Sequence, residues 1–211
     1  MQFAEYIGAK ELSVEWNLPL EPQAKDWVEA KIKEWDLNAG PLVVINPAAS
    51  KPERSWHAEG YLEVISFLQS HYRANIVLCG GPSKHDKDLA EQIKCSAKVI
   101  DMVGQTKLPQ LLALIAKADL VICPDTGPSH MAAAVNTPVI ALHGVTKPEI
   151  SGPYGQLHQV FNRYNEAKNL LMKAKLKEKP QDWFNKVHHP EVMNLIKAPE
   201  VCEHIKTNWS Y

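Results

Sequence analysis

Paired cysteines, long apolar runs and an excess of charge of one sign are all missing from this 211-residue sequence. The four cysteines are scattered and none forms a CxxC pair, which argues against a disulfide framework and against a cysteine-based zinc site. Such cysteine usage is typical of proteins in a reducing cytoplasm, where we expect this one to act.

The charge balance and the hydrophobic segments exclude two further classes of protein. A net charge of −1 at pH 7 argues against a general nucleic-acid binder. No apolar run is long enough to cross a membrane and no secretory leader is evident, so we expect neither. With 45% hydrophobic and 22% charged residues, the chain is expected to fold around one good core with appendages.

Strand and helix patterns alternate through the middle of the chain. Strands are predicted at 42–46, 75–79, 98–101, 120–123 and 138–142, and helices at 24–35, 58–71, 84–94, 108–118 and 129–135. Short connections between alternating elements predict an α/β fold with a doubly wound, Rossmann-like parallel sheet. Pro199 is placed to open a last helix, because a proline at the first helical turn costs no hydrogen bond.

The most informative stretch is DLVICPDTGPSHMAAAVNTPVIALHGVTKPEISGPYG, residues 119–155. Asp125 and Thr126 are good N-cap residues, and Gly127 allows close approach to the backbone. A helix that begins there directs free N–H groups and a partial positive charge beyond the strand end, where phosphates bind well. An ordinary capped turn without a ligand is the alternative, but His130 and the second polar turn, 143–146, favour a binding site.

Two other loops follow predicted strands. After the first strand, small residues accompany Ser50, Lys51 and Arg54, a composition that suits a diphosphate; exposed loop charge is the alternative. After the second strand, Gly80 and Gly81 form either a plain turn or the border of a nucleotide site, with Ser83 or Asp86 near a ribose hydroxyl.

No metal or cofactor is expected. The loops contain no DxD-like motif beside the predicted phosphate site, and His188, His189 and His204 are a poor ligand set.

DTGPSHMAAA, followed by ALHGVTKPEISGPYG, resembles the signature of the ADP-heptose:lipopolysaccharide heptosyltransferases, glycosyltransferase family 9. Those enzymes are two-domain GT-B glycosyltransferases, and the signature belongs to the C-terminal, donor-binding domain. The resemblance covers roughly residues 42–205. It implies a linker or helical arm from a missing N-terminal domain at 1–40, a nucleotide-sugar-binding domain at 41–160 and a C-terminal helical extension at 161–211.

The resemblance also implies a reaction. Heptose would pass from ADP-L-glycero-D-manno-heptose to the lipopolysaccharide inner core, with inversion and without a metal. The acceptor and an aspartate general base would be held by the N-terminal domain, so this chain alone is expected to bind donor and transfer little or nothing. The alternative is a stand-alone or degenerate nucleotide-sugar-binding module without transferase activity.

The resemblance assigns roles to individual residues. Arg54 and His130 would be catalytic through stabilisation of the leaving group, although a packing role for His130 is the alternative. Asp125 would hold sugar hydroxyls or the loop backbone, and Trp56 would be a packing anchor. The donor-binding residues are then Ser50, Lys51, Arg54, Thr106, Asp125, Thr126, Gly127 and His130.

The C-terminal region carries two further predictions. Residues 163–186 include seven basic and three acidic residues, typical of a solvated face; contact with anionic lipid at the inner membrane is the functional alternative. In GT-B enzymes the last helix packs across the domain junction, so Trp209 and Tyr211 are expected to be partly exposed if the partner domain is absent.

Overall fold

The computed structural model describes residues 2–10, 16, 18–173 and 186–211. Its centre is a six-stranded, all-parallel sheet in the order β3-β2-β1-β4-β5-β6. This order confirms the predicted doubly wound, Rossmann-like fold. The strands are β1 (Leu42–Ile45), β2 (Asn75–Leu78), β3 (Ile100–Asp101), β4 (Leu120–Pro124), β5 (Val139–His143) and β6 (Phe161–Asn162). The sequence pattern does not predict β6, whose two residues are too few to show a period.

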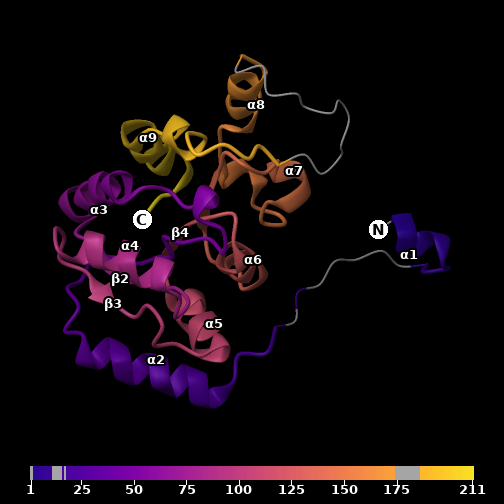
Figure 1. Ribbon diagram of the computed structural model, residues 1–211. Helices are drawn as coiled ribbons and strands as arrows, with labels where there is room; N and C mark the ends of the chain where they lie inside the picture. The colour runs from indigo at the N-terminus through magenta and orange to yellow at the C-terminus, as the bar shows by residue number, and fades with distance from the viewer. Residues whose placement is uncertain (1, 11–15, 17, 174–185) are drawn as a thin grey trace.

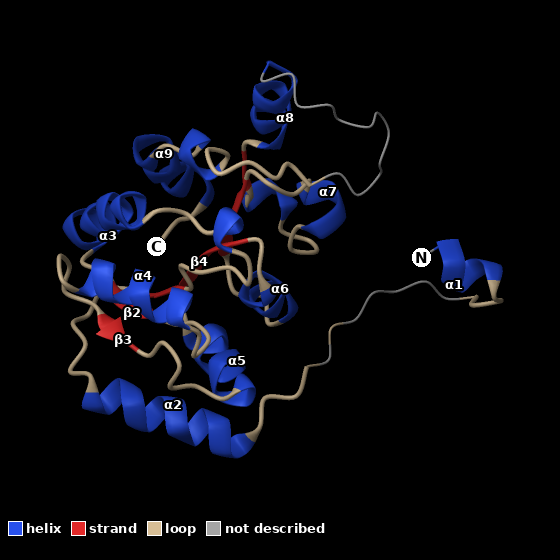
Figure 2. Cartoon of the chain, viewed as in Figure 1, coloured by secondary structure: helices blue, strands red, loops and turns tan. Residues whose placement is uncertain are grey.

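Helices lie on both sides of the sheet, and Figure 2 shows them in blue around the red strands. Five of them confirm the predicted helices: α2 (Pro22–Glu34), α3 (Ala58–Tyr72), α4 (Lys84–Lys94), α5 (Leu108–Lys117) and α6 (Gly127–Ala134). The others are α1 (Gln2–Tyr6), α7 (Pro148–Ser151), α8 (Tyr164–Lys173) and α9 (Ala198–Asn208), with 3₁₀ turns η1 (Pro52–Arg54), η2 (Leu157–Gln159) and η3 (Met193–Leu195). Of the described helices, none is long and apolar enough to span a bilayer.

The strands bury both faces, as a parallel sheet requires. Alternate residues face opposite layers, so Val43 and Ile45 pack with α3, α4 and α9, whereas Leu42 and Val44 pack with α2, α5 and α6. The sheet therefore separates two apolar layers, visible in Figure 1 as helix groups on either side of the strands.

The last helix completes the first of these layers. Pro199 lies in the first turn of α9, as predicted, and α9 packs on α3. Two indoles fix this arrangement: Trp56 Nε1 donates to Ile196 O at 3.2 Å, and Trp209 Nε1 donates to Asp119 O at 3.1 Å. Trp56 is a packing anchor, as predicted. The expected exposure of Trp209 is wrong, because this ring is only 5% exposed; Tyr211 is 65% exposed.

The strand order creates a crevice at one edge of the sheet. The chain leaves β1 toward β2 on one side, and β4 then returns to the other side of β1. Open α/β sheets bind their ligands at such a switch point, beyond the carboxyl ends of the strands. The loops after β1 and β4 meet there, although about seventy residues separate them in the chain.

Candidate functional site

A cleft of about 760 Å³ opens at the switch point between β1 and β4. Its walls come from the loop after β1, the turn after β2 and the first turn of α6. The lining residues are Asn46, Ala48, Ala49, Ser50, Pro52, Arg54, Gly81, Ser83, His85, Asp86, Asp125, Thr126, Gly127, Pro128 and His130. Six of the eight residues predicted to bind the donor are among them.

Arg54 is the cation at the centre of this cleft. It ends the turn η1, and its side chain is 17% exposed. Nη2 donates to Ser50 Oγ at 2.6 Å, and Nη1 lies 3.6 Å from Asp125 Oδ2. The guanidinium thus links the loop after β1 to the turn after β4. An incoming anion would compete with Asp125 and Ser50 for the same N–H groups.

Asp125 is held from two sides. Besides the ion pair with Arg54, its Oδ2 accepts a hydrogen bond from Ser151 Oγ at 3.1 Å, which ties α7 to the site. The side chain is only 10% exposed. An unpaired carboxylate at this depth would be costly, so the ion pair with Arg54 explains how Asp125 is tolerated in the cleft wall.

The first turn of α6 forms the opposite wall. Thr126 is the N-cap residue, but its hydroxyl makes no capping bond. Ser129 is instead turned inward, where its Oγ donates to Thr126 O at 2.7 Å. A Cβ built on Gly127 would meet no atom within 4 Å, so open space lies over the helix start. His130 is exposed and lines the cleft, one turn into the helix. Pro128 has no N–H and Ser129 N donates to Thr126 O at 3.1 Å, so the first turn of α6 offers an anion the N–H of Gly127.

Buried polar atoms without partners gather at this one place. Within the described part of the chain, the buried side-chain atoms that lack a hydrogen bond are Arg54 Nε, Thr126 Oγ1 and His143 Nε2. They come from the ends of β1, β4 and β5. Buried polar groups are normally paired, so these three atoms are available to water or to a ligand.

His143 lies at the end of β5, fully buried. Its Nδ1 is 3.3 Å from Thr146 O and 3.2 Å from Thr146 Oγ1. Burial lowers the pKa of His143, against the smaller opposing influence of the nearby Asp125 carboxylate. The imidazole is therefore neutral at pH 7. His143 and Thr146 support the second polar turn from beneath.

The turn after β2 contributes a wall that the sequence predicts only in part. Ser83 caps α4, and Asp86 accepts hydrogen bonds from the Ser83 hydroxyl and, at 2.9 Å, from Gly81 N. Both side chains are engaged in shaping the turn. His85, which sequence reasoning misses, lies between them in the chain and lines the cleft. Its position in the first turn of a helix that begins at the sheet edge is the signal that could have found it.

Two predicted contacts lie outside the cleft lining. Lys51 is exposed on the loop after β1, and Thr106 precedes α5 beyond the wall formed by Gly81 and His85. The other six predicted residues, Arg54, Thr126 and His130 among them, face one common cleft rather than separate surfaces. The ligand contacts of all eight residues stay predictions.

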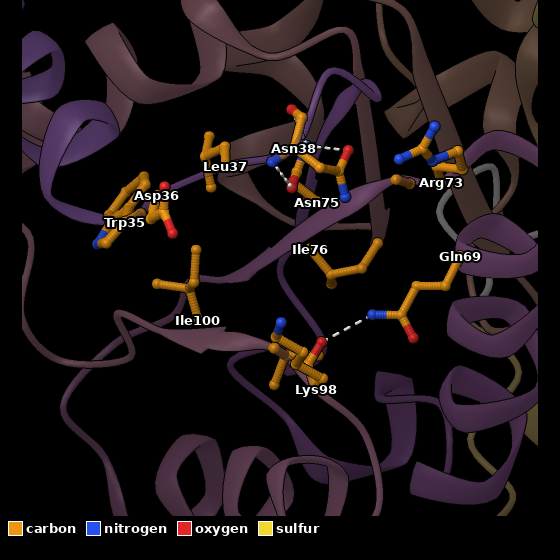
Figure 3. A pocket seen from close by; sticks show the side chains of 12 residues that line it. Trp35, Asp36, Leu37, Asn38, Gln69, Arg73, Asn75, Ile76, Lys98 and Ile100 are labelled. Carbon is orange, nitrogen blue, oxygen red and sulfur yellow. Dashed lines mark hydrogen bonds between the residues drawn. The ribbon is translucent and has the colours of Figure 1, made fainter.

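A second hollow, of about 430 Å³, lies at the opposite edge of the sheet (Figure 3). Its polar groups bond mainly to one another: Asn75 Nδ2 donates to Gly40 O at 2.9 Å, and Gln69 Nε2 donates to Lys98 O at 2.7 Å. The first bond joins β2 to the α2–β1 connection, and the second joins α3 to the segment before β3. The hollow is a seam between elements at the amino ends of the strands, away from the switch point. In neither hollow do the described residues include a group of three or more metal-ligating side chains.

The sequence of this chain is similar to a known family of proteins. The family model described as glycosyltransferase family 9 (heptosyltransferase) matches residues 1–180. The lipopolysaccharide core heptosyltransferase OpsX of Haemophilus influenzae is 33% identical over 208 residues, which covers 98% of this chain and 58% of that protein. Lipopolysaccharide heptosyltransferase 3 of Escherichia coli K12 is 40% identical over 107 residues, 49% of this chain and 31% of that protein. The chain thus spans little more than half of the length of the first of these relatives.

Solved structures agree on the fold. A glycosyl transferase of family 9 from Veillonella parvula superposes with a TM-score of 0.77 at 20% identity, over 98% of this chain and 57% of that one. The E. coli heptosyltransferase WaaC with ADP gives a TM-score of 0.63 at 21% identity, over 98% and 54%. The family match over most of the sequence and the shared Rossmann-like architecture lead to one conclusion: this chain belongs to glycosyltransferase family 9, the heptosyltransferase family.

Proposed function

We propose that this chain is the donor-binding half of a heptosyltransferase and that its switch-point cleft holds ADP-L-glycero-D-manno-heptose. The observation that carries the proposal is the meeting of Arg54 with the free start of α6 across one polar cleft. A side-chain cation and a helix N-terminus on facing walls are suited to a diphosphate, which needs charge-assisted hydrogen bonds on both sides.

In the proposed complex, diphosphate oxygens accept hydrogen bonds from Arg54 and from the backbone N–H of Gly127. Negative charge grows on the diphosphate as the bond to the sugar breaks, and groups already aimed at it stabilise the departing ADP. His130, at the exposed edge of the same wall, is proposed to donate to a phosphate oxygen at this stage. Transfer by this route needs no metal.

The sugar is proposed to extend toward a smaller hollow of about 350 Å³ that also has Arg54 and Asp125 in its wall. Thr146, Lys147 and Ser151 line it, so hydroxyl, ammonium and carboxylate groups are available to polyhydroxylated sugar. The acceptor, a lipopolysaccharide inner core, and the general base for inversion are proposed to come from an acceptor-binding half. The donor half alone would bind ADP-heptose without turning it over.

Calorimetric titration with ADP, UDP and GDP tests the proposal. ADP is expected to bind most tightly. Arg54→Ala should weaken the binding of ADP by about 1.5–3 kcal/mol, or roughly ten- to a hundredfold in Kd, because a charge-assisted contact is lost. Lys33→Ala removes an exposed cation of α2 and should leave Kd unchanged. A preference for UDP or GDP, or a Kd indifferent to Arg54, would exclude this donor assignment.

A further inference from the structure

On the wall formed by the turn after β2, two of the three polar side chains are engaged within the turn itself. Ser83 and Asp86 bond to each other and to the turn, and the Asp86 carboxylate fills the space beside Gly80, where a Cβ would lie 2.9 Å from its Oδ1. Moving either side chain toward a ligand would open the start of α4. The remaining polar side chain on this wall is that of His85, which is half-buried.

His85 is held by one nitrogen only. Its Nε2 lies 2.8 Å from Ser55 Oγ, and the same oxygen accepts a hydrogen bond from Ala49 N at 2.9 Å. Ala49 immediately precedes Ser50, and Ser55 immediately follows Arg54. The ring of His85 is therefore fixed to both ends of the loop that carries the central cation of the cleft.

These hydrogen bonds leave one ring nitrogen of His85 unused. The Ser55 hydroxyl has one proton and two lone pairs, and one lone pair accepts from Ala49 N–H. Toward His85 Nε2 the hydroxyl donates its proton in one tautomer of the imidazole and accepts in the other. Within the described residues, Nδ1 has no hydrogen-bond partner, and it carries the proton in the tautomer whose Nε2 accepts from Ser55.

We propose that His85 accepts from the Ser55 hydroxyl at Nε2 and is a donor-binding residue, whose Nδ1–H contacts an oxygen on the nucleoside side of the diphosphate, either of the ribose or of the adjoining phosphate. The inference rests on the proposed function, because it places the nucleoside end of the same ligand along α4. A fixed ring, with one nitrogen anchored and the opposite nitrogen unused on a cleft wall, is prepared for a directional contact.

Two variants of His85 test the roles of its two ring nitrogens separately. The side-chain amide of glutamine reaches the position of Nε2, and that of asparagine reaches the position of Nδ1. His85→Gln therefore keeps the link to Ser55 and loses the ligand contact, whereas His85→Asn does the reverse. Affinities for ADP and for inorganic pyrophosphate, measured by calorimetry on the same proteins, report the nucleoside-side contact and the phosphate loop separately.

The ratio of ADP affinity to pyrophosphate affinity is expected to fall about tenfold in His85→Gln and to stay near the wild-type value in His85→Asn. Pyrophosphate binding should be unchanged in His85→Gln. The proposal is overturned if the ratio is unaffected in His85→Gln, or if His85→Asn is the variant in which it falls. Absence of ADP binding to the wild-type protein would instead remove the proposed function, and this inference with it.

Discussion

Replacing Gly127 with alanine should maintain or raise the stability of this protein and lower its affinity for ADP. Gly127 is the first residue of α6, its φ is not in the left-handed region, and a Cβ there would meet no protein atom within 4 Å. Nothing in the fold therefore requires glycine at this position. Substitution of Gly by Ala at a compatible site stabilises a protein by about 0.4–1 kcal/mol, mainly by restricting the unfolded chain.

The melting temperature of Gly127→Ala should accordingly stay the same or rise, by roughly 1–4 °C for a domain of this size. The affinity for ADP should fall instead. The methyl group would occupy the space through which a diphosphate approaches the Gly127 N–H, so the contacts at this wall would lengthen or be lost. Loss of charge-assisted hydrogen bonds here corresponds to about 1.5–3 kcal/mol, or roughly a ten- to hundredfold weaker Kd.

Thermal unfolding followed by circular dichroism and calorimetric titration with ADP measure the two effects on the same sample. Unchanged ADP affinity in a variant with a wild-type or higher melting temperature would refute the placement of the diphosphate over the start of α6. A lower melting temperature would refute the claim that the space over Gly127 is open to solvent and ligand.

Two further predictions concern stability. Because the folded-state pKa of His143 is lowered, the unfolded chain binds a proton more readily, so the free energy of unfolding should fall as pH drops below about 6.5, by about 1.4 kcal/mol per pH unit until the folded-state pKa is reached. Urea denaturation at a series of pH values measures this dependence. The free energy of unfolding of His143→Phe should change less steeply with pH than that of the wild type, and an equal slope would assign the effect to other groups. A Cβ at Gly60 would collide with the ring of Trp56, so Gly60→Ala should destabilise the protein by about 1–3 kcal/mol, whereas the exposed Ala39→Gly should have little effect on the same melts.

The sequence predicts the elements of this fold well and the contacts between them poorly. Short apolar runs such as those of β4 and β5, and the periodic faces of α3 and α5, are local properties that composition and spacing reveal. β6 and α7 are too short to carry a period. The ion pair between Arg54 and Asp125 depends on β1 and β4 being neighbours, and no local pattern specifies strand order.

The expected exposure of Trp209 is the clearest error, and its cause is physical. Trp209 is expected to be partly exposed because, in GT-B enzymes, the last helix packs across the junction with a partner domain. In the structure the indole has a partner within the chain, Asp119 O, and packs on Tyr72 with ring centroids 5.0 Å apart. A tryptophan buries best where its N–H is satisfied, and sequence alone does not show where that acceptor lies.

The seating of α9 and Trp209 has a consequence for how the protein is made. One layer of the core combines residues from β1, α3 and β2 with residues of α9, so the earliest part of the sheet depends on the latest part of the chain. During synthesis, the surface of this layer that α9 covers stays exposed until Trp209 has emerged from the ribosome. The nascent chain therefore passes through a long aggregation-prone interval, and a truncation that removes α9 should harm yield and solubility before it harms any step at the cleft.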